Sequence, residues 1–480
     1  MSHTVVIGAG PAGLTTAYEL LKRRQAQHSV TLLEASDDVG GSFRTQDYCG
    51  YRIDLEIGGF STQDGYVQQI WDELVGEDCV EVEVRSLIHY RHRLFKYPLS
   101  ATNAFKHLGP IDIARSGISY LASWMSQQQA LAVAASTSEA WVSERFGPHF
   151  SRIFFDPYFE KIWGTPASQL APSVARHALA RPSGRDSTLM RLLIDAAVES
   201  PAQKVAYPTL GNGQVWKKCK GLTEQAGATF ALNTRVIKLV HDGDRVMQAI
   251  VTAGENIQTI PIEHLVSSLP LAELVTCLSA SDAVQASARC LRYRHIVQVA
   301  LVLDVAELFG EQSLYVNHPE VLVGRIQNFK NWSLAMVPDA DKTCLGLTYF
   351  CDETDATWQM DDASLVQLAG QELVELGLIE SSDLIASGIA IRQPCAYPVH
   401  TVSTLHHLAI VQDYLSGFTN LQTLGRQGLH RYAKLDEHLL NGKRAAENIL
   451  TSWSAGRSYT QHDLWEIPSQ SAVSATKNTF

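Results

Sequence analysis

The first fifty residues alternate between a short apolar run, a helical pattern and a second apolar run. His3 to Ile7 is rich in β-branched side chains, which is typical of a buried parallel strand. Apolar side chains then recur at three- and four-residue spacing, which predicts a helix, at Leu14, Ala17, Leu20 and Leu21. Ser29 to Leu33 predicts a second strand. The order strand, helix, strand indicates a βαβ unit of an α/β fold.

Three glycines and one acid punctuate this unit. Gly8, Gly10 and Gly13 lie between the first strand and the helix, and Glu34 ends the second strand. Gly8 permits a tight turn, Gly10 lets the backbone approach a pyrophosphate, and Gly13 lets the helix pack close to the strand. The helix N-terminus offers unpaired N–H groups to a diphosphate. The residues predict a dinucleotide site; the alternative is a glycine loop that only closes the unit.

Glu34 narrows the choice of dinucleotide. Its carboxylate can accept hydrogen bonds from two ribose hydroxyls, but it repels a 2′-phosphate. NADP is therefore disfavoured as the bound dinucleotide, whereas FAD and NAD are both compatible with these residues.

Later stretches of the chain show the same helical and strand-like patterns of apolar residues. Ile111 to Met125 and Ser187 to Val198 predict helices, and His295 to Leu303 and Thr343 to Phe350 predict strands. Ile118 to Ala135 is the most membrane-like stretch, but three consecutive glutamines interrupt it at 127–129. A span needs about 20 predominantly apolar residues, so we expect no transmembrane segment.

Composition and charge restrict the class of protein. The chain has 480 residues, of which 45% are hydrophobic and 19% charged, which is typical of a globular protein. Its net charge of −11 argues against nucleic acid as a partner. The eight cysteines form no C-x-x-C pair and no zinc spacing, so we expect free thiols, no metal and a reducing compartment. With no secretory signal pattern at its start, the chain is predicted to be cytoplasmic.

Downstream motifs resemble a known superfamily. Glu34 is followed by Gly40, Gly41 and Arg44, a segment similar to that of the FAD-binding oxidoreductases of the glutathione-reductase-like superfamily, where it wraps the ribose and pyrophosphate. The chain also resembles the branch that joins UDP-galactopyranose mutase, protoporphyrinogen oxidase and amine oxidases. The stretches that carry this resemblance are 94–99, 141–147, 154–164, 207–216, 267–270, 323–333, 396–398 and 425–432.

The resemblance implies FAD as the cofactor and a set of residues that hold it. Arg44 would otherwise be a solvated charge, Asp436 an N-terminal helix charge, and Val236 a buried strand residue on the strand predicted from Thr234 to Val240. In the related enzymes the Gly425-Arg426 segment enters a helix that faces the flavin. The implied cofactor-binding residues are Gly8, Gly10, Gly13, Glu34, Gly40, Gly41, Arg44, Gly58, Gly59, Val236, Gly425, Arg426 and Asp436.

Aromatic and arginine side chains supply candidates for the substrate side. Guanidinium groups bind phosphate through two parallel hydrogen bonds, and tyrosines suit a flat or sugar-bearing molecule. Core packing is the alternative for each aromatic residue, and a salt bridge is the alternative for the arginine. The candidates for binding are Tyr158, Trp163, Arg325, Tyr349, Tyr397 and Tyr432; Arg325 and His430 are also the candidates for catalysis.

The predicted fold class is α/β: a Rossmann-like, glutathione-reductase-like FAD-binding domain with an inserted α+β substrate domain. The flavin motifs place the first domain at 1–85, 205–270 and 396–455, and the second at 86–204 and 271–395. Residues 456–480 are rich in Ser, Thr and Gln and predict a flexible tail.

One departure from the related motifs affects the predicted reaction. Where the mutases carry a histidine that lines the flavin edge, this chain has Phe60 after Gly58 and Gly59. The leading hypothesis is an enzyme that isomerises the sugar ring of a nucleotide sugar or similar anionic molecule. The alternative is an FAD-dependent oxidoreductase that dehydrogenates a small biosynthetic intermediate, with oxygen or another molecule as the electron acceptor. NAD(P)H or another donor is a possible partner for reducing the flavin. A flavin-stabilised binding protein without turnover is the third reading.

Overall fold

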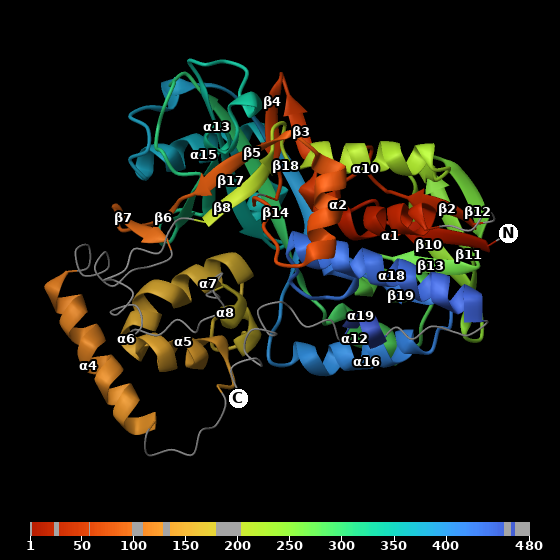
Figure 1. Cartoon of the computed structure of the whole chain (residues 1–480). Coiled ribbons are helices and arrows are strands. Elements are labelled where there is room, and N and C mark those ends of the chain that lie inside the picture. The colour runs from red at the N-terminus through yellow and green to blue at the C-terminus, as the bar shows by residue number, and fades with distance from the viewer. Residues whose placement is uncertain are drawn as a thin grey trace.

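The computed structural model describes residues 2–23, 28–56, 58–97, 109–127, 135–178, 203–455 and 462–465. Figure 1 shows a parallel sheet with its helices on one side of the molecule and a second, larger sheet with a group of helices on the other. The predicted helix Ser187 to Val198 lies outside the described residues.

A parallel sheet of five strands is assembled from distant parts of the chain. Its strand order is β19-β13-β1-β2-β9, and every neighbouring pair is parallel. The predictions of strands near 3–7 and 29–33 are confirmed. The bounds are β1 (Ser2–Ile7), β2 (His28–Leu33), β9 (Thr229–Ala231), β13 (His264–Ser267) and β19 (Leu421–Thr423).

Four helices pack on one face of this sheet and share its hydrophobic core. They are α1 (Pro11–Lys22), α2 (Gly65–Val75), α10 (Gly213–Gln225) and α18 (Leu435–Ala455). The opposite face packs against the antiparallel strands β10 (Arg235–Asp242), β11 (Arg245–Ala253) and β12 (Asn256–Pro261), and against α11 (Leu271–Cys277), α12 (Asp282–Arg289) and α16 (Thr404–Ser416).

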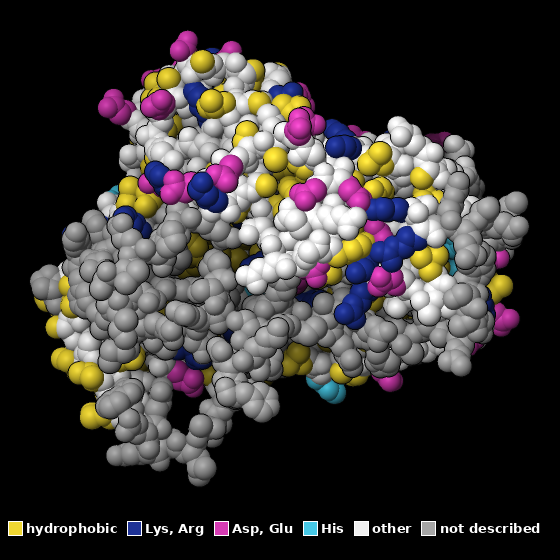
Figure 2. Space-filling model, in the orientation of Figure 1, with side chains coloured by type: hydrophobic (Ala, Val, Ile, Leu, Met, Phe, Trp, Pro, Cys, Tyr) yellow, Lys and Arg dark blue, Asp and Glu magenta, His cyan; other side chains and the backbone are white. Residues whose placement is uncertain are grey.

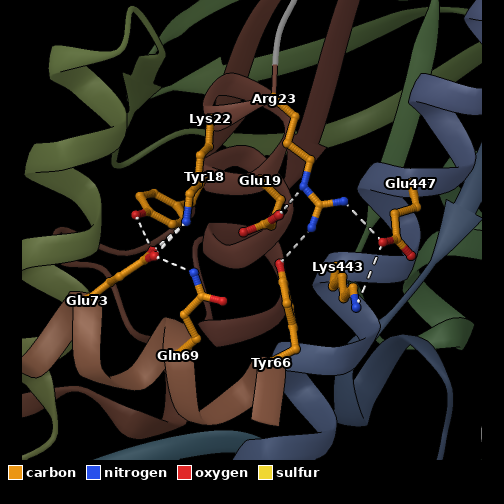
Figure 3. A network of polar contacts seen from close by, with 9 residues as sticks. All are labelled: Tyr18, Glu19, Lys22, Arg23, Tyr66, Gln69, Glu73, Lys443 and Glu447. Carbon is orange, nitrogen blue, oxygen red and sulfur yellow. Dashed lines mark hydrogen bonds and ion pairs between the residues drawn. The ribbon is translucent and has the colours of Figure 1, made fainter.

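A polar network ties α1 to α2 and α18 (Figure 3). Glu19, 1% exposed, pairs with Arg23 at 2.8 Å. Arg23 also donates to the Tyr66 hydroxyl at 3.2 Å and to Glu447 at 3.1 Å. At the other end of the network, the Glu73 carboxylate accepts hydrogen bonds from Lys22, Tyr18 and Gln69. These contacts neutralise the Glu19 charge at the point where the three helices meet.

The second sheet has seven strands in the order β18-β14-β17-β16-β15-β6-β7. Its pairs are antiparallel except for β15 and β6, which run parallel. The strands predicted near 295–303 and 343–350 are confirmed within it. The bounds are β6 (Ser86–Tyr90), β7 (Arg93–Tyr97), β14 (Tyr293–Leu303), β15 (Ser313–Val316), β16 (Arg325–Asn328), β17 (Thr343–Cys351) and β18 (Ile385–Pro398), and α15 (Asp362–Glu375) covers one face.

Helices between β7 and β8 form a third packed group with an aromatic core. The helix predicted at 111–125 is confirmed as α4. The bounds are α4 (Pro110–Gln127), α5 (Ser138–Phe146), α6 (Pro148–Phe150), the π-helical turn η2 (Ser151–Phe155), α7 (Asp156–Trp163) and α8 (Pro172–Ala178).

Two short antiparallel strand pairs and several turns connect the larger parts. The pairs are β3 (Thr45–Tyr48) with β4 (Tyr51–Asp54), and β5 (Cys79–Val84) with β8 (Gln203–Pro208). The turns are η1 (Gly41–Phe43), α13 (Phe329–Trp332), η3 (Leu334–Met336), α14 (Ala356–Gln359), η4 (Ser382–Leu384), α17 (Gly425–Gly428) and α19 (His462–Trp465).

Part of the predicted tail 456–480 is folded. In α19 the Leu464 side chain is fully buried, and the Trp465 indole N–H donates to the Thr423 hydroxyl at 3.2 Å. A composition rich in small polar residues did not reveal this anchor, because two apolar residues suffice to dock one helical turn. The domain limits given above stay a prediction.

Candidate nucleotide and substrate site

The carboxyl ends of β1, β13 and β19 bring three loops together. A Cβ built on Gly8, where φ is +96°, would lie 2.0 Å from the Ser268 Oγ atom, and one built on Gly428 would lie 2.9 Å from the Ser267 carbonyl oxygen. The loops can approach this closely only because glycine has no side chain. Ligands of open α/β sheets bind at this edge.

The first turn of α1 presents bare backbone at the same edge. Gly10 is the N-cap and makes no side-chain hydrogen bond, so the N–H groups of the first turn have no cap. A Cβ on Gly10 would meet no atom of the described chain within 4 Å, whereas one on Gly13 would lie 2.1 Å from the Gly8 carbonyl oxygen. The position of Gly41 adds a second wall, because its Cβ would lie 3.3 Å from the Gly10 Cα atom. This glycine cradle fits a diphosphate.

Glu34 and Val236 lie at the other end of the cradle. The Glu34 carboxylate accepts from the Ala9 N–H at 2.7 Å and the Ser36 N–H at 2.9 Å. Its carbonyl oxygen accepts from the Thr234 N–H at 2.8 Å, which brings the start of β10, including the buried Val236, beside the tip of β2. The arrangement fits a ribose and base, although Val236 packs as a strand core residue as well.

Arg44 and Gly40 close the loop after β2. Gly40 has φ +102°, a conformation that favours glycine. The Arg44 side chain donates to the Gly41 carbonyl at 3.3 Å and to Gln393 Oε1 at 3.0 Å. Burial lowers the pKa of Arg44, and acidic residues of the loop, Glu34 first, oppose that effect. Arg44 is therefore a packed, hydrogen-bonded residue rather than a solvated charge.

Gly59 and Phe60 lie in the core near α2. A Cβ on Gly59 would lie 1.9 Å from Val205 Cγ2, whereas Gly58 has open space around it. Phe60, 4% exposed, stacks on Trp71 with ring centroids 4.1 Å apart, and its backbone pairs with Ala206. The position that carries a histidine in the mutases thus holds an apolar ring that is packed away.

The segment from Gly425 to Asp436 contains one short helical turn and the start of a long helix. Gly425, with φ +76°, opens only a single turn, α17, and the long helix α18 begins at Leu435. A helical turn at Gly425-Arg426 agrees with the expected entry into a helix, and whether it faces the flavin stays a prediction. Asp436 lies in the first turn of α18, where its Oδ1 accepts from the Glu437 N–H at 3.0 Å. It has the contact of an N-terminal helix charge, and a cofactor contact stays a prediction.

Arg426 is held inside the protein between two tyrosine rings. Its guanidinium carbon lies 4.7 Å from the Tyr397 ring centre and 4.8 Å from that of Tyr432, and the two rings are nearly parallel at 13°. It donates to Glu56 at 3.3 Å and to the carbonyl oxygens of Ala396 and Ala433. The stacking and the ion pair fix the guanidinium in place.

Glu56 is a site residue that sequence reasoning missed. It is buried, and it accepts from the Tyr397 hydroxyl at 2.8 Å as well as from Arg426. Burial alone raises the pKa of Glu56, but Arg426 and Arg325 outweigh burial, so the pKa lies below its ordinary value. The signal that could have revealed it is an acid within an apolar stretch directly before Gly58-Gly59.

Arg325 lies close to this group and keeps donors free. Its Nε and Nη2 atoms are buried and have no hydrogen-bond partner among the described residues. Burial alone lowers the pKa of Arg325, but Tyr397, Glu56, Tyr315 and Tyr158 raise it, and the net direction is upward. The guanidinium is therefore charged, and its two buried nitrogen atoms are unpaired, which is costly unless a ligand binds them.

The substrate candidates separate into two groups. Tyr158, Tyr397 and Tyr432 surround Arg325 or Arg426, and Trp163 contacts Tyr397 with ring centroids 6.3 Å apart. Two residues not among the candidates complete the group, since Tyr315 lies 4.9 Å from Tyr97 and 6.5 Å from Tyr158 between ring centroids.

Tyr349 is the exception, and its prediction as a substrate residue is wrong. It is buried in the core beneath α15 and donates to Glu372 at 2.9 Å. Its neighbour Thr348, not Tyr349, is the β17 residue that pairs with Arg325. Because successive strand residues point to opposite faces, Tyr349 lies on the far side of the sheet from Arg325.

His430 lies apart from the tyrosine group. It is fully buried at φ +44°, with the His400 ring stacked 5.3 Å away and the Tyr293 ring 4.7 Å away between centroids. Burial lowers the pKa of His430 to about 3, so its imidazole is neutral. Its proposed catalytic role stays a prediction.

The described residues contain no group of three or more His, Cys, Asp or Glu arranged to hold a metal ion. No helix within the described ranges has the length and apolarity to span a bilayer. Figure 2 shows acidic and basic side chains beside one another over the face of Figure 1, so positive charge on this face is locally balanced.

Known proteins share this fold. Residues 6–74 match the family model of an NAD(P)-binding Rossmann-like domain. The reduced UDP-galactopyranose mutase structure superposes with a TM-score of 0.79 at 20% identity, covering 94% of this chain and 96% of the mutase. A chain from Exiguobacterium sp. 255-15 assigned as a protoporphyrinogen oxidase gives 0.73 at 16% identity, covering 94% and 99%. Cyclohexylamine oxidase from Brevibacterium oxydans gives 0.65 at 14% identity, with the same coverage.

Curated relatives match only a short segment. The L-amino-acid oxidase of Bungarus fasciatus is 60% identical over 43 residues, which are 9% of this chain and 8% of the oxidase. The chain thus matches less than a tenth of the length of these relatives. Together the comparisons confirm the α/β fold with a Rossmann-like domain and the likeness to the mutase, protoporphyrinogen oxidase and amine oxidase branch.

Proposed function

We propose that the protein is an FAD-dependent enzyme that acts on an anionic small molecule. FAD, when bound, supplies the electron-transfer and covalent chemistry, which protein side chains lack. The chain's own residues bind the two molecules, orient them and exclude water. The fold and the glycine cradle support the cofactor, and Arg325 supports the substrate.

The cofactor would lie along the carboxyl edge of the parallel sheet. Gly8, Gly10 and Gly13 would face the diphosphate, with Gly40 and Gly41 on its other side. Glu34 would exchange its bonds to the Ala9 and Ser36 N–H groups for bonds from ribose hydroxyls. The loops around Gly425 and Arg426 would receive the flavin end.

The substrate assignment is supported by the Nε–Nη2 edge of the Arg325 guanidinium, whose N–H donors have no partner among the described residues. Both nitrogen atoms are buried, and the guanidinium lies among tyrosines that belong to other elements. Bidentate binding of an anionic group would satisfy both donors at once. Such a site orients a substrate rather than stabilising the empty protein.

Two reactions fit this site, and a separate observation favours each. Isomerisation of a nucleotide sugar, the leading sequence-based hypothesis, is supported by the TM-score of 0.79 with the mutase. Dehydrogenation of a small molecule is supported by Phe60, because the apolar ring packed on Trp71 replaces the histidine of the mutases. A redox-neutral isomerase needs flavin that is already reduced and consumes no electron acceptor, whereas a dehydrogenase bleaches its flavin when substrate is added.

The cofactor proposal is tested on the purified protein. We expect a yellow protein whose FAD is released completely on denaturation. Adding candidate anions under anaerobic conditions then distinguishes the two reactions: a dehydrogenase loses its flavin absorbance, whereas an isomerase keeps it. A protein that stays colourless after incubation with FAD would refute the proposal. NAD(P)H is the donor to try first for reducing the flavin.

Arg325→Lys tests the substrate assignment. Lysine keeps the charge but offers no two-donor edge, so we expect kcat/KM to fall about ten- to a hundredfold, the value of one or two charge-assisted hydrogen bonds. FAD content and Tm should stay at wild-type values. Arg85→Lys is the matched control, because Arg85 forms an exposed ion pair with Glu83 at 2.8 Å. Equal activity of both variants would remove Arg325 from the site.

A further inference from the structure

Three ionised groups lie together near the proposed substrate: Glu56 and Arg426 are buried, and Arg325 is half-buried with its Nε and Nη2 atoms inaccessible to solvent. Two of them compensate one another, because Arg426 donates to Glu56 at 3.3 Å and its remaining contacts are neutral carbonyl oxygens and tyrosine rings. The Tyr397 hydroxyl donates to the same Glu56 oxygen at 2.8 Å. Glu56 and Arg426 thus balance one another in charge, with only the Arg426 Nε atom left without a hydrogen-bond partner among the described residues.

The third group, Arg325, has no carboxylate within ion-pair distance among the described residues. Its unpartnered atoms, Nε and Nη2, carry the hydrogens of one edge of the guanidinium plane. Two parallel N–H donors on one edge match two oxygens bound to a single carbon or phosphorus atom. The ligand group is therefore a carboxylate or a phosphate.

The charges decide between these two. Two guanidinium groups and one carboxylate leave a single positive charge in this cluster. A carboxylate neutralises it, whereas a phosphate monoester or a nucleoside diphosphate brings at least one additional negative charge. An excess charge beside these solvent-inaccessible donor atoms is unfavourable.

We infer that the substrate carries one negative charge, on a carboxylate bound to the Nε–Nη2 edge of Arg325, and that Glu56 sets this preference. The inference rests on the proposed function and narrows its substrate class. The tyrosine rings at 158, 315 and 432 would pack against the apolar body of the molecule. A substrate with a single carboxylate favours dehydrogenation of a carboxylate-bearing molecule over isomerisation of a nucleotide sugar.

The test compares two probes of similar shape, phenylacetate and phenyl phosphate, with UDP as a nucleoside diphosphate. At pH 8 phenylacetate carries one charge and phenyl phosphate about two, since the second phosphate pKa is about 6. Titration calorimetry on the FAD-loaded wild-type protein should give a Kd for phenylacetate about tenfold or more below those of phenyl phosphate and UDP, the value of one uncompensated charge contact.

Glu56→Gln should change this ranking, because it raises the charge of the cluster by one. Phenyl phosphate should then bind at least as tightly as phenylacetate. Tyr397→Phe is the matched control: it also removes a hydrogen bond from Glu56 but keeps the charge, so the wild-type ranking should persist. If Glu56→Gln does not fold, Arg325→Met replaces it and should abolish phenylacetate binding while FAD stays bound.

The outcomes separate this inference from the proposed function. Tighter wild-type binding of UDP or phenyl phosphate, lost in Arg325→Met, overturns the inference and leaves the proposed anion site intact. An unchanged ranking in a folded Glu56→Gln protein also overturns it. Binding of every probe with equal affinity to wild type and Arg325→Met, or no FAD binding at all, refutes the proposed function itself.

Discussion

Gly10 and Gly13 lie close together in the chain but have different roles, one in cofactor binding and one in packing. Substitutions at the two positions can distinguish these roles. Gly10 has φ −75°, which any residue adopts, and its Cβ direction meets no described atom within 4 Å. Gly10→Val should therefore fold normally, within about 0.5 kcal/mol of wild type. It should bind no FAD, because the added methyl groups occupy the place of the diphosphate. FAD absorbance after gel filtration and thermal unfolding measure the two properties.

Gly13→Val is the contrasting variant. Its Cβ would lie 2.1 Å from the Gly8 carbonyl oxygen, so α1 and β1 must separate. We expect a loss of at least about 1–3 kcal/mol in the free energy of unfolding, the cost of overpacking. Normal FAD content in Gly10→Val would show that the diphosphate lies elsewhere, and a stable Gly13→Val would contradict the packing described above.

At the residue scale, the sequence could reveal the glycines but not their acidic neighbour. The spacing of Gly8, Gly10 and Gly13 is local, so one stretch of chain contains the whole signal. Glu56 acquires its meaning from Arg426 and Tyr397, which lie more than 300 residues away in sequence. Tyr349 shows the converse: its motif suggested a pocket, but strand alternation placed it on the opposite face.

Among the elements, the junction of α1, α2 and α18 depends on one arginine. Glu19 is buried and Arg23 is its ion-pair partner at 2.8 Å. Arg23→Met leaves a buried carboxylate unpaired, so we expect a loss of about 3 kcal/mol in the free energy of unfolding. Urea unfolding at pH 7.5 measures this loss.

The matched control removes another charge of the same network. Glu447 is 42% exposed and also contacts Arg23, at 3.1 Å. Glu447→Gln should cost under about 1 kcal/mol, as exposed ion pairs do. Equal losses for the two variants would mean that the burial of Glu19 contributes nothing.

At the element scale, periodicity predicted what is local and missed what is paired at long range. The strands near 3–7, 29–33, 295–303 and 343–350 are confirmed because their residues alternate or run apolar over several positions. The parallel pairing of β6 with β15 joins Ser86–Tyr90 to Ser313–Val316. No local pattern encodes a partner more than 200 residues away, so the sheet order could not be derived from the sequence.

For the whole molecule, buried histidines predict instability in acid. Burial lowers the pKa of His430 and His438 to about 3, and that of His89, His177 and His264 to about 4, from 6.5. Because the folded pKa is lowered, the stabilisation is present above pH 6.5 and is lost as the pH falls toward 4. Each histidine should remove about 2 kcal/mol between pH 7.5 and 5.

Asp54 acts in the opposite direction. It is fully buried, and burial raises its pKa to about 6, so its contribution to stability falls as the pH rises through 6. Burial also raises the pKa of Asp156, Glu372, Asp436 and Glu437. Burial lowers the pKa of four further histidines, His28, His295, His318 and His400, so the histidines with a lowered pKa outnumber the carboxyl groups with a raised one. The free energy of urea unfolding should therefore be lower at pH 5 than at pH 7.5, and His438→Gln should reduce the difference by about 2 kcal/mol. Equal stability at the two pH values would contradict this prediction.

The parallel sheet takes its central strand from the first residues of the chain and an edge strand from Leu421–Thr423. During synthesis, a ribosome that has made most of the protein has therefore not yet made β19, the Gly425 loop or α18. Synthesis proceeds at about 5–20 residues per second, so the nascent chain must wait tens of seconds with the apolar face of α1 uncovered. Cofactor capture becomes a late event in biogenesis, and chains that terminate early should be substrates for chaperones and proteases rather than partly active enzymes.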